Sequence, residues 1–109
     1  MSIFNKESRI TDLLKELGAE NIAHVKNGSL YAHLLRVGRT LESFGLEGSV
    51  VHAGMCHSVY GTDFFPEKLL SLDERARLRS VTGEEAERLV FLFGTIKRGT
   101  LYKKDAVAK

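Results

Sequence analysis

The fold is decided by a stretch near the middle of the chain, which reads Val50-Val51-His52-Ala53-Gly54-Met55-Cys56-His57-Ser58-Val59-Tyr60-Gly61. If this stretch is helical, small and apolar side chains cover most sides of the helix. A helix of that kind is buried by its neighbours on most of its surface. We therefore expect a central helix from about Glu47 to Tyr60, and Gly61 is expected to end it.

Amphipathic helices are predicted before this stretch, from apolar residues at helical spacing. The first has the stripe Ile10, Leu13, Leu14 and Leu17. Gly18 stands where a left-handed C-terminal cap would fall. The second is capped by Ser29 and ended by Gly45, and its stripe is formed by Leu30, Leu34, Val37, Leu41 and Phe44.

Two more helices are predicted after it. Residues 62–70 contain Phe64-Phe65-Pro66 and are expected to form a partly buried loop. A short charged helix should follow over 73–79. Thr82 with Glu85 three residues later is a capping-box pattern, and the helix it opens has the predicted core face Ala86, Leu89, Val90 and Phe93.

The resulting prediction is an all-α orthogonal bundle of about five helices in a single domain, 1–109, with residues 103–109 frayed. No window shows convincing strand-like alternation of apolar and polar residues. A chain of 109 residues, of which 43% are hydrophobic, is long enough for one core and too short for two.

Composition also restricts the expected partners and location. The net charge of +2 comes from 16 basic and 14 acidic residues, which is not the basic excess of a nucleic-acid binder. No stretch approaches the roughly 20 apolar residues of a membrane span. The N-terminus has no apolar core of signal-peptide length. The single Cys excludes an internal disulfide. We therefore expect a cytoplasmic protein whose partner is a small molecule, with no nucleic acid and no membrane. Its oligomeric state is left open.

The candidate chemistry lies in the histidines. His33 borders the apolar stripe of the second predicted helix, and His57 has small residues around it on the third. The space beside His57 holds either a ligand or the backbone of a crossing helix. We expect the two imidazoles to converge. His52 lies about 140° around the same helix from His57, so it is expected to be structural or exposed. His24 has no partner nearby in the sequence, and Cys56 reads as an inert core thiol.

A resemblance to a known superfamily follows from these histidines. A His in one helix, followed by a helix of small and apolar residues that ends in a second His, is similar to the HD-domain superfamily of metal-dependent phosphohydrolases. Residues 53–62 look still more like an HD-related family whose signature is close to A-G-x-x-H-S-V-Y-G-T. Residues 83–87 also resemble the last helix of that family. The resemblance covers about residues 29–93 and implies an HD-like all-α fold.

The chain departs from the superfamily motif directly after the second histidine. The motif has a metal-binding Asp there, and this chain has Ser58. Divalent ions such as Mn, Fe or Zn, the cofactors that the resemblance implies, need more ligands than two histidines provide. The implied metal set is therefore His33, His57 and a third residue, for which the candidates are Asp63, Glu84 and Glu87.

Three classes of function are open at this point. The first, our working hypothesis, is a hydrolase-like or lyase-like enzyme that acts on a small polar metabolite, phosphorylated or not. Its catalytic residues would be His33 and His57, as metal ligands or acid–base groups, and its substrate-binding residues Ser58, Tyr60 and Thr62. The second is a degenerate HD-fold module that binds a small molecule or nucleotide. The third is a structural or oligomerising protein.

Overall fold

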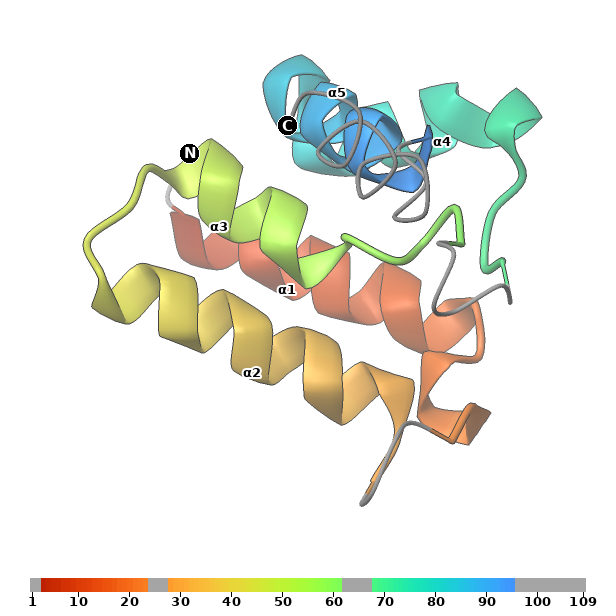
Figure 1. Ribbon diagram of the computed structural model, residues 1–109, viewed down its shortest axis with the longest axis horizontal. Coiled ribbons are helices and arrows are strands. Elements are labelled where there is room, and N and C mark those ends of the chain that lie inside the picture. The colour runs from red at the N-terminus through yellow and green to blue at the C-terminus, as the bar shows by residue number, and fades with distance from the viewer. Residues whose placement is uncertain (1–2, 24–27, 62–67, 96–109) are drawn as a thin grey trace, which may run out of the picture.

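Helix α3, Gly48–Met55, lies at the centre of the computed structural model, which describes residues 3–23, 28–61 and 68–95 (Figure 1). It packs most extensively against α2, Leu30–Ser43, and α5, Glu84–Thr95, and it also contacts α1, Ile3–Glu16, and α4, Arg75–Thr82. Every residue of 51–56 is buried. The prediction of a central, buried helix is therefore confirmed.

The described ranges also contain two short 3-10 helices, Ala19–Asn21 and Leu72–Glu74. Across the described ranges the chain is a compact all-α globule of five α-helices without strands, which confirms the predicted fold class. No helix in the described part of the chain is long and apolar enough to cross a membrane.

The ends of α1 and α2 follow from local chemistry that the sequence shows. Gly18 has a φ of 87°, in the left-handed region that glycine tolerates best. The Ser29 hydroxyl accepts a hydrogen bond from the Ala32 N–H at 3.1 Å and caps α2. The predicted core position of Phe44 is wrong: α2 ends at Ser43, and the Phe44 side chain is 72% exposed.

Helix α3 ends five residues earlier than predicted, so His57 lies in the turns that follow α3 and not on the helix itself. The ring Nδ1 of His57 donates to the Gly54 carbonyl oxygen at 2.7 Å. In a continuing helix that oxygen would accept from the backbone N–H of Ser58. The imidazole therefore competes with the backbone for this carbonyl. The backbone closes into tight turns instead, in which the Cys56 N–H donates to the Ala53 oxygen at 3.1 Å.

The predicted start of the last helix is also wrong. Thr82 is the final residue of α4, and its hydroxyl donates to the carbonyl oxygens of Leu78 and Gly83. It therefore does not act as an N-cap. Gly83, with a φ of 94°, links α4 to α5. The capping-box contact that forms lies earlier, where the Ser71 N–H donates to the Glu74 carboxylate at 2.9 Å.

The face that α5 buries differs from the prediction at two positions. Ala86 and Val90 are buried as expected, but the predicted core residues Leu89 and Phe93 are 38% and 44% exposed. The remaining buried position is taken by Glu87, which is 1% exposed. The buried face is therefore rotated from the predicted one toward an acidic residue.

Close packing between α2 and α3 depends on two glycines. A Cβ on Gly38 would lie 2.5 Å from Cγ of Met55, and a Cβ on Gly54 would overlap Cδ1 of Leu41. Both distances are shorter than van der Waals contact allows. These glycines therefore let the two helices approach closely, which brings His33 on α2 toward the end of α3.

Of the predicted loop over 62–70, residues 62–67 lie outside the described ranges. The N–H groups of Leu69 and Leu70 both donate to the carbonyl oxygen of Val59. The chain beyond the loop is thereby tied to the turns after α3. The short charged helix predicted over 73–79 is present as α4, preceded by the 3-10 turn Leu72–Glu74.

Candidate functional site

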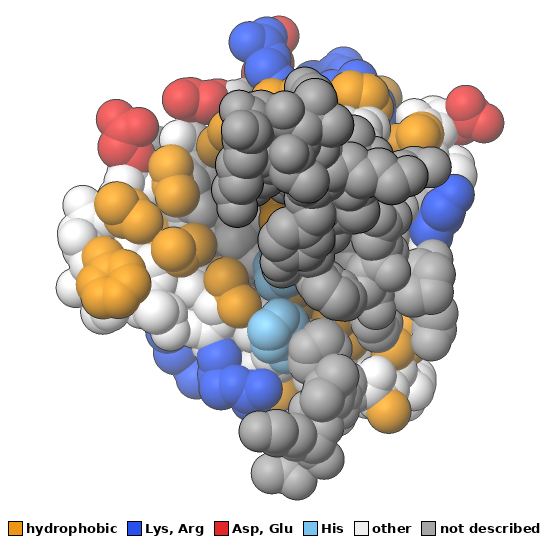
Figure 2. Space-filling view, in the orientation of Figure 1, with side chains coloured by type: hydrophobic (Ala, Val, Ile, Leu, Met, Phe, Trp, Pro, Cys, Tyr) orange, Lys and Arg blue, Asp and Glu red, His pale blue; other side chains and the backbone are white. Residues whose placement is uncertain are grey.

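The imidazoles of His33 and His57 meet beside the end of α3. Their ring centroids lie 5.3 Å apart, with an angle of 74° between the ring planes. Figure 2 shows histidine side chains together in the middle of one face of the molecule. The prediction that these two rings converge is therefore confirmed.

The His57 ring is held in one orientation by its neighbours. Its Nδ1 faces the Gly54 carbonyl oxygen at 2.7 Å, and a carbonyl only accepts hydrogen bonds, so Nδ1 carries the proton. In the neutral ring the lone pair is then on Nε2. Phe93 packs edge-on against the same ring, with 5.4 Å between centroids. Phe93 is thus partly exposed on α5, and it packs beside the histidine pair.

A shallow hollow of about 340 Å³ opens along α2 next to His33. It is lined by His33, Arg36, Val37, Thr40 and Leu41. Arg36 and Thr40 are exposed and supply hydrogen-bond donors to the hollow. A guanidinium pairs well with a carboxylate or a phosphate because its N–H groups match the spacing of their oxygens. The hollow therefore combines an imidazole with a group that favours anions.

The predicted substrate-binding residues occupy different environments. Ser58 is 3% exposed, and its Oγ has no hydrogen-bond partner among the described residues. Tyr60 is also buried, and its hydroxyl donates to the Glu87 carboxylate at 2.8 Å. Burial, and then the neighbouring carboxylate, raises the pKa of Tyr60 well above its ordinary value. Thr62 and Asp63 lie outside the described residues.

Glu87, which the sequence offers only as a candidate metal ligand, is the centre of a buried polar cluster with Arg75 and Tyr60. Arg75 donates to both of its oxygens, from Nε at 2.7 Å and from Nη2 at 2.9 Å. Burial alone would raise the pKa of the Glu87 carboxyl. The hydrogen bonds from Arg75 and Tyr60 outweigh burial, so the pKa is lowered. The cluster therefore holds a charged carboxylate that joins α4, α5 and the turns after α3. The signal in the sequence was an acidic residue at helical spacing from the apolar positions of α5.

The described residues do not by themselves form the metal site that the HD resemblance implies. Among them, no group of three or more His, Cys, Asp or Glu side chains is placed to hold an ion. Both oxygens of Glu87 are bonded to Arg75, and Glu84 is exposed and pairs with Arg88 at 3.8 Å. Two imidazoles are fewer than the three protein ligands of a typical catalytic zinc site.

His52 and Cys56 have the structural character expected of them. The His52 side chain is buried, and its Nε2 lies 4.0 Å from Oε2 of Glu7. Burial and the nearby Lys6 ammonium lower the pKa of His52. Cys56 is fully buried, and burial raises the pKa of its thiol to about 12. Such a thiol stays protonated and unreactive near neutral pH.

Comparison with known proteins gives a family without a known activity. No curated protein and no solved structure shows significant similarity to the chain. A family model does match, over residues 13–98, which include the whole segment on which the HD resemblance rests. The relation to HD domains stays a resemblance. The chain belongs to the family described as a domain of unknown function, DUF6817.

Proposed function

We propose that the chain is a small-molecule enzyme that transfers protons at the His33–His57 pair, acting on a small polar metabolite with an anionic group. The observation that carries this proposal is the 5.3 Å approach of the two rings, one of which is held by a backbone carbonyl. Two imidazoles from separate elements that lie together at the surface can act as an acid–base pair, in which one ring accepts a proton and the other donates one.

His57 is the proposed general base. Its neutral ring presents the Nε2 lone pair, because Nδ1–H is bonded to the Gly54 carbonyl. When Nε2 accepts a proton, that carbonyl stays bonded to Nδ1–H and stabilises the imidazolium. The proton comes from water in a hydrolysis or from carbon in an elimination, which keeps the hydrolase-like and lyase-like options together. His33 is the second acid–base group, at the same reacting atoms.

The hollow along α2 is the proposed position of the anionic end of the substrate. Arg36 would pair with a carboxylate or phosphate, and the Thr40 hydroxyl would donate a further hydrogen bond. The volume of about 340 Å³ lies within the range of small-molecule sites. His33 lines the same hollow, so a substrate held there reaches the histidine pair.

A module that binds the same class of molecule without turnover is the second candidate. Tyr60 favours it, because its hydroxyl is bonded to Glu87 inside the core and is not presented to a ligand. Ser58 favours it as well, since it stands where the HD motif has a carboxylate.

Turnover and binding can be separated by NMR on a defined mixture of phosphorylated and carboxylated metabolites. Wild-type protein, His57→Ala and His24→Ala are each incubated with the mixture. His24→Ala is the matched control, since His24 has no assigned role. The proposal expects signals of one substrate to decay with wild type and His24→Ala, and about 100-fold or more slowly with His57→Ala.

The other outcomes decide between the two candidates. Line broadening without decay that is lost in His57→Ala supports the binding module. Equal behaviour of wild type and His57→Ala, with or without decay, contradicts any role of this site.

A further inference from the structure

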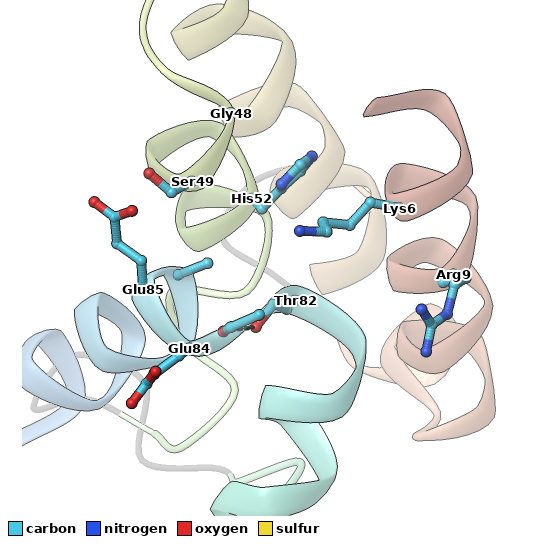
Figure 3. A pocket seen from close by; sticks show the side chains of 10 residues that line it. Lys6, Arg9, Gly48, Ser49, His52, Thr82, Glu84 and Glu85 are labelled. Atoms are coloured by element: carbon cyan, nitrogen blue, oxygen red, sulfur yellow. Dashed lines mark hydrogen bonds between the residues drawn. The ribbon is translucent and has the colours of Figure 1, made fainter. Parts of the chain in front are cut away.

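Helix α5 lies beside both ends of α3. In its first turn, Glu85 faces Ser49 at the start of α3, across a cavity of about 550 Å³ that Lys6 also lines (Figure 3). In its last turn, Phe93 packs against the His57 ring, with 5.4 Å between the centroids. The two helices also contact each other directly. The position of α5 therefore determines what packs against the His57 ring.

His57 lies in a series of tight backbone turns that follow α3. The Val59 N–H donates to the Cys56 carbonyl oxygen at 3.0 Å, and the Gly61 N–H donates to the Ser58 carbonyl oxygen at 2.9 Å. Each of these bonds spans only three residues, as in a 3-10 helix. Because such turns have little slack, a shift at one residue moves its neighbours. The place of His57 therefore depends on how both ends of the segment 56–61 are held.

The far end of this segment is attached to α5 at Tyr60. The Tyr60 hydroxyl donates to Oε2 of Glu87 at 2.8 Å, and both residues are buried. A Cβ on Gly94 would lie 3.2 Å from the Tyr60 Cβ and 3.4 Å from the Gly61 carbonyl oxygen. The α5 backbone at Gly94 therefore rests directly against the segment. Glu87 and Gly94 hold the same two turns from one helix.

The carboxylate that Tyr60 binds is itself fixed in place. Arg75 on α4 donates to both of its oxygens, at 2.7 and 2.9 Å. The Arg75 guanidinium also lies over the Phe91 ring of α5, with 3.7 Å between its central carbon and the ring centroid. A paired arginine and carboxylate with two parallel bonds have a defined geometry, and a charged acceptor makes a stronger hydrogen bond than a neutral one. The Tyr60 hydroxyl therefore has a strong acceptor in a defined position.

We infer that Tyr60 is a positioning residue for the histidine pair. Its hydrogen bond to Glu87 holds the segment that carries His57 in one position against α5. The orientation of the His57 ring relative to His33 and Phe93 is set in this way. This inference rests on the proposed role of His57 as general base. It replaces the substrate contact that the sequence predicts for Tyr60, because the hydroxyl is bonded to Glu87 inside the core.

Tyr60→Phe removes only the hydroxyl and tests this role without a substrate. Long-range ¹H–¹⁵N NMR spectra report the two ring nitrogens of His57. We expect both signals to shift in Tyr60→Phe, because the ring is no longer held in the same place against the Gly54 carbonyl. Thr82→Val is the matched control. It also removes a buried hydroxyl, whose bonds are to the Leu78 and Gly83 carbonyl oxygens, and it should leave the His57 signals as they are in wild type.

The second readout uses the substrate identified in the turnover experiment. We expect Tyr60→Phe to lower kcat about tenfold, because a small displacement of an acid–base group slows the reaction. KM should stay unchanged, since the hydroxyl is bonded within the core and does not contact the substrate. Thr82→Val should keep both values. A raised KM with unchanged kcat would make Tyr60 a substrate contact and would overturn the positioning role.

His57 ring signals in Tyr60→Phe that match those of wild type also overturn it. If Tyr60→Phe does not fold, Gly94→Ala decides. Its added methyl group presses on Tyr60 from α5 and should shift the same ring signals, and unchanged signals there contradict the inference. Because the ring signals are measured without a substrate, they test the role of Tyr60 even if the turnover test of His57 refutes the proposed function.

Discussion

His57 donates a hydrogen bond to the Gly54 oxygen and makes edge contacts with the rings of His33 and Phe93. It is half-buried, so its removal leaves little closed space. We predict that His57→Ala lowers the free energy of unfolding by about 1 kcal/mol, the net value of one hydrogen bond. Leu34→Ala, at a fully buried position on α2, should cost about 2–5 kcal/mol.

Urea unfolding of the two variants and the wild type measures this difference. If His57→Ala lowers the free energy of unfolding as much as Leu34→Ala does, His57 stabilises the fold as a core residue does. The approach of the two histidines would then be explained by stability and not by function.

At this scale the sequence predicts some placements and not others. The approach of His33 and His57 was predicted from their place on the inward faces of two neighbouring helices, and the rings do meet although His57 lies just beyond the end of α3. The bond from His57 to the Gly54 carbonyl did not, since a side chain competing with the backbone leaves no periodic signal. Glu87 is a candidate only as a metal ligand in the sequence, and its buried pairing with Arg75 was missed for a related reason. A buried carboxylate is acceptable only when a partner such as Arg75 reaches it, and that partner comes from another helix.

Helices α4 and α5 are joined by the Glu87 cluster, and this makes the stability of the element pair depend on pH. The pKa of Glu87 is lower in the folded protein than its ordinary value of 4.5. Such a group contributes stability that is fully present above the unfolded pKa and is lost as the pH falls through the folded pKa. The wild type should therefore lose this contribution below about pH 4.5.

Glu87→Gln removes the titrating group and leaves Arg75 without its charged partner. We predict a loss of roughly 2 kcal/mol at neutral pH, and a smaller further loss in acid than the wild type shows. Glu16→Gln, in the exposed pair with Arg77, is the control and should change stability by less than about 1 kcal/mol. Urea unfolding at pH 7 and pH 3 measures both effects. An equal acid-induced loss in the wild type and Glu87→Gln would show that Glu87 does not carry it.

The close crossing of α2 and α3 gives a second prediction for the elements. Alanine favours a helix over glycine by about 1 kcal/mol, but a methyl group at Gly54 overlaps the Leu41 side chain. Overpacking of this kind costs about 1–3 kcal/mol, so Gly54→Ala should lower the melting temperature. Arg39→Ala, at an exposed position on α2, should leave it nearly unchanged. A higher melting temperature for Gly54→Ala would mean that the crossing is looser than the structure shows.

The end of a helix could be predicted from the sequence where a single residue determines it. It could not be predicted where two adjacent helices could use the same residue as a cap. Gly18 and Ser29 act locally, and both predictions are confirmed. Thr82 has the pattern of an N-cap, but its hydroxyl bonds back to the α4 backbone, and the sequence does not show which of two adjacent helices a threonine serves. Leu89 and Phe93 are predicted core residues because the spacing of apolar residues indicates an apolar face on α5. The helices packed against α5 determine which side of α5 is buried, and the sequence does not show that.

Across the whole molecule, α3 lies between the histidine pair and the cavity lined by Lys6. The histidine pair lies beside its C-terminal end, and the cavity at Lys6 lies beside its N-terminal end. Because α3 is only eight residues long and touches all four other helices, a ligand in either place contacts the centre of the fold. The sequence indicated the histidine pair. The lining of the cavity brings together residues 6, 52 and 83, whose proximity arises only from the tertiary structure.

Whether His33 and His57 form one site is measured by the melting temperatures of wild type, His33→Ala and His57→Ala, with and without the metabolites that respond in the turnover experiment. A ligand that binds the folded protein raises its melting temperature. We predict that the rise seen with wild type is lost in both variants, because both imidazoles contact the same molecule. A rise that persists in either variant, at the same ligand concentration, would contradict a shared site at His33 and His57.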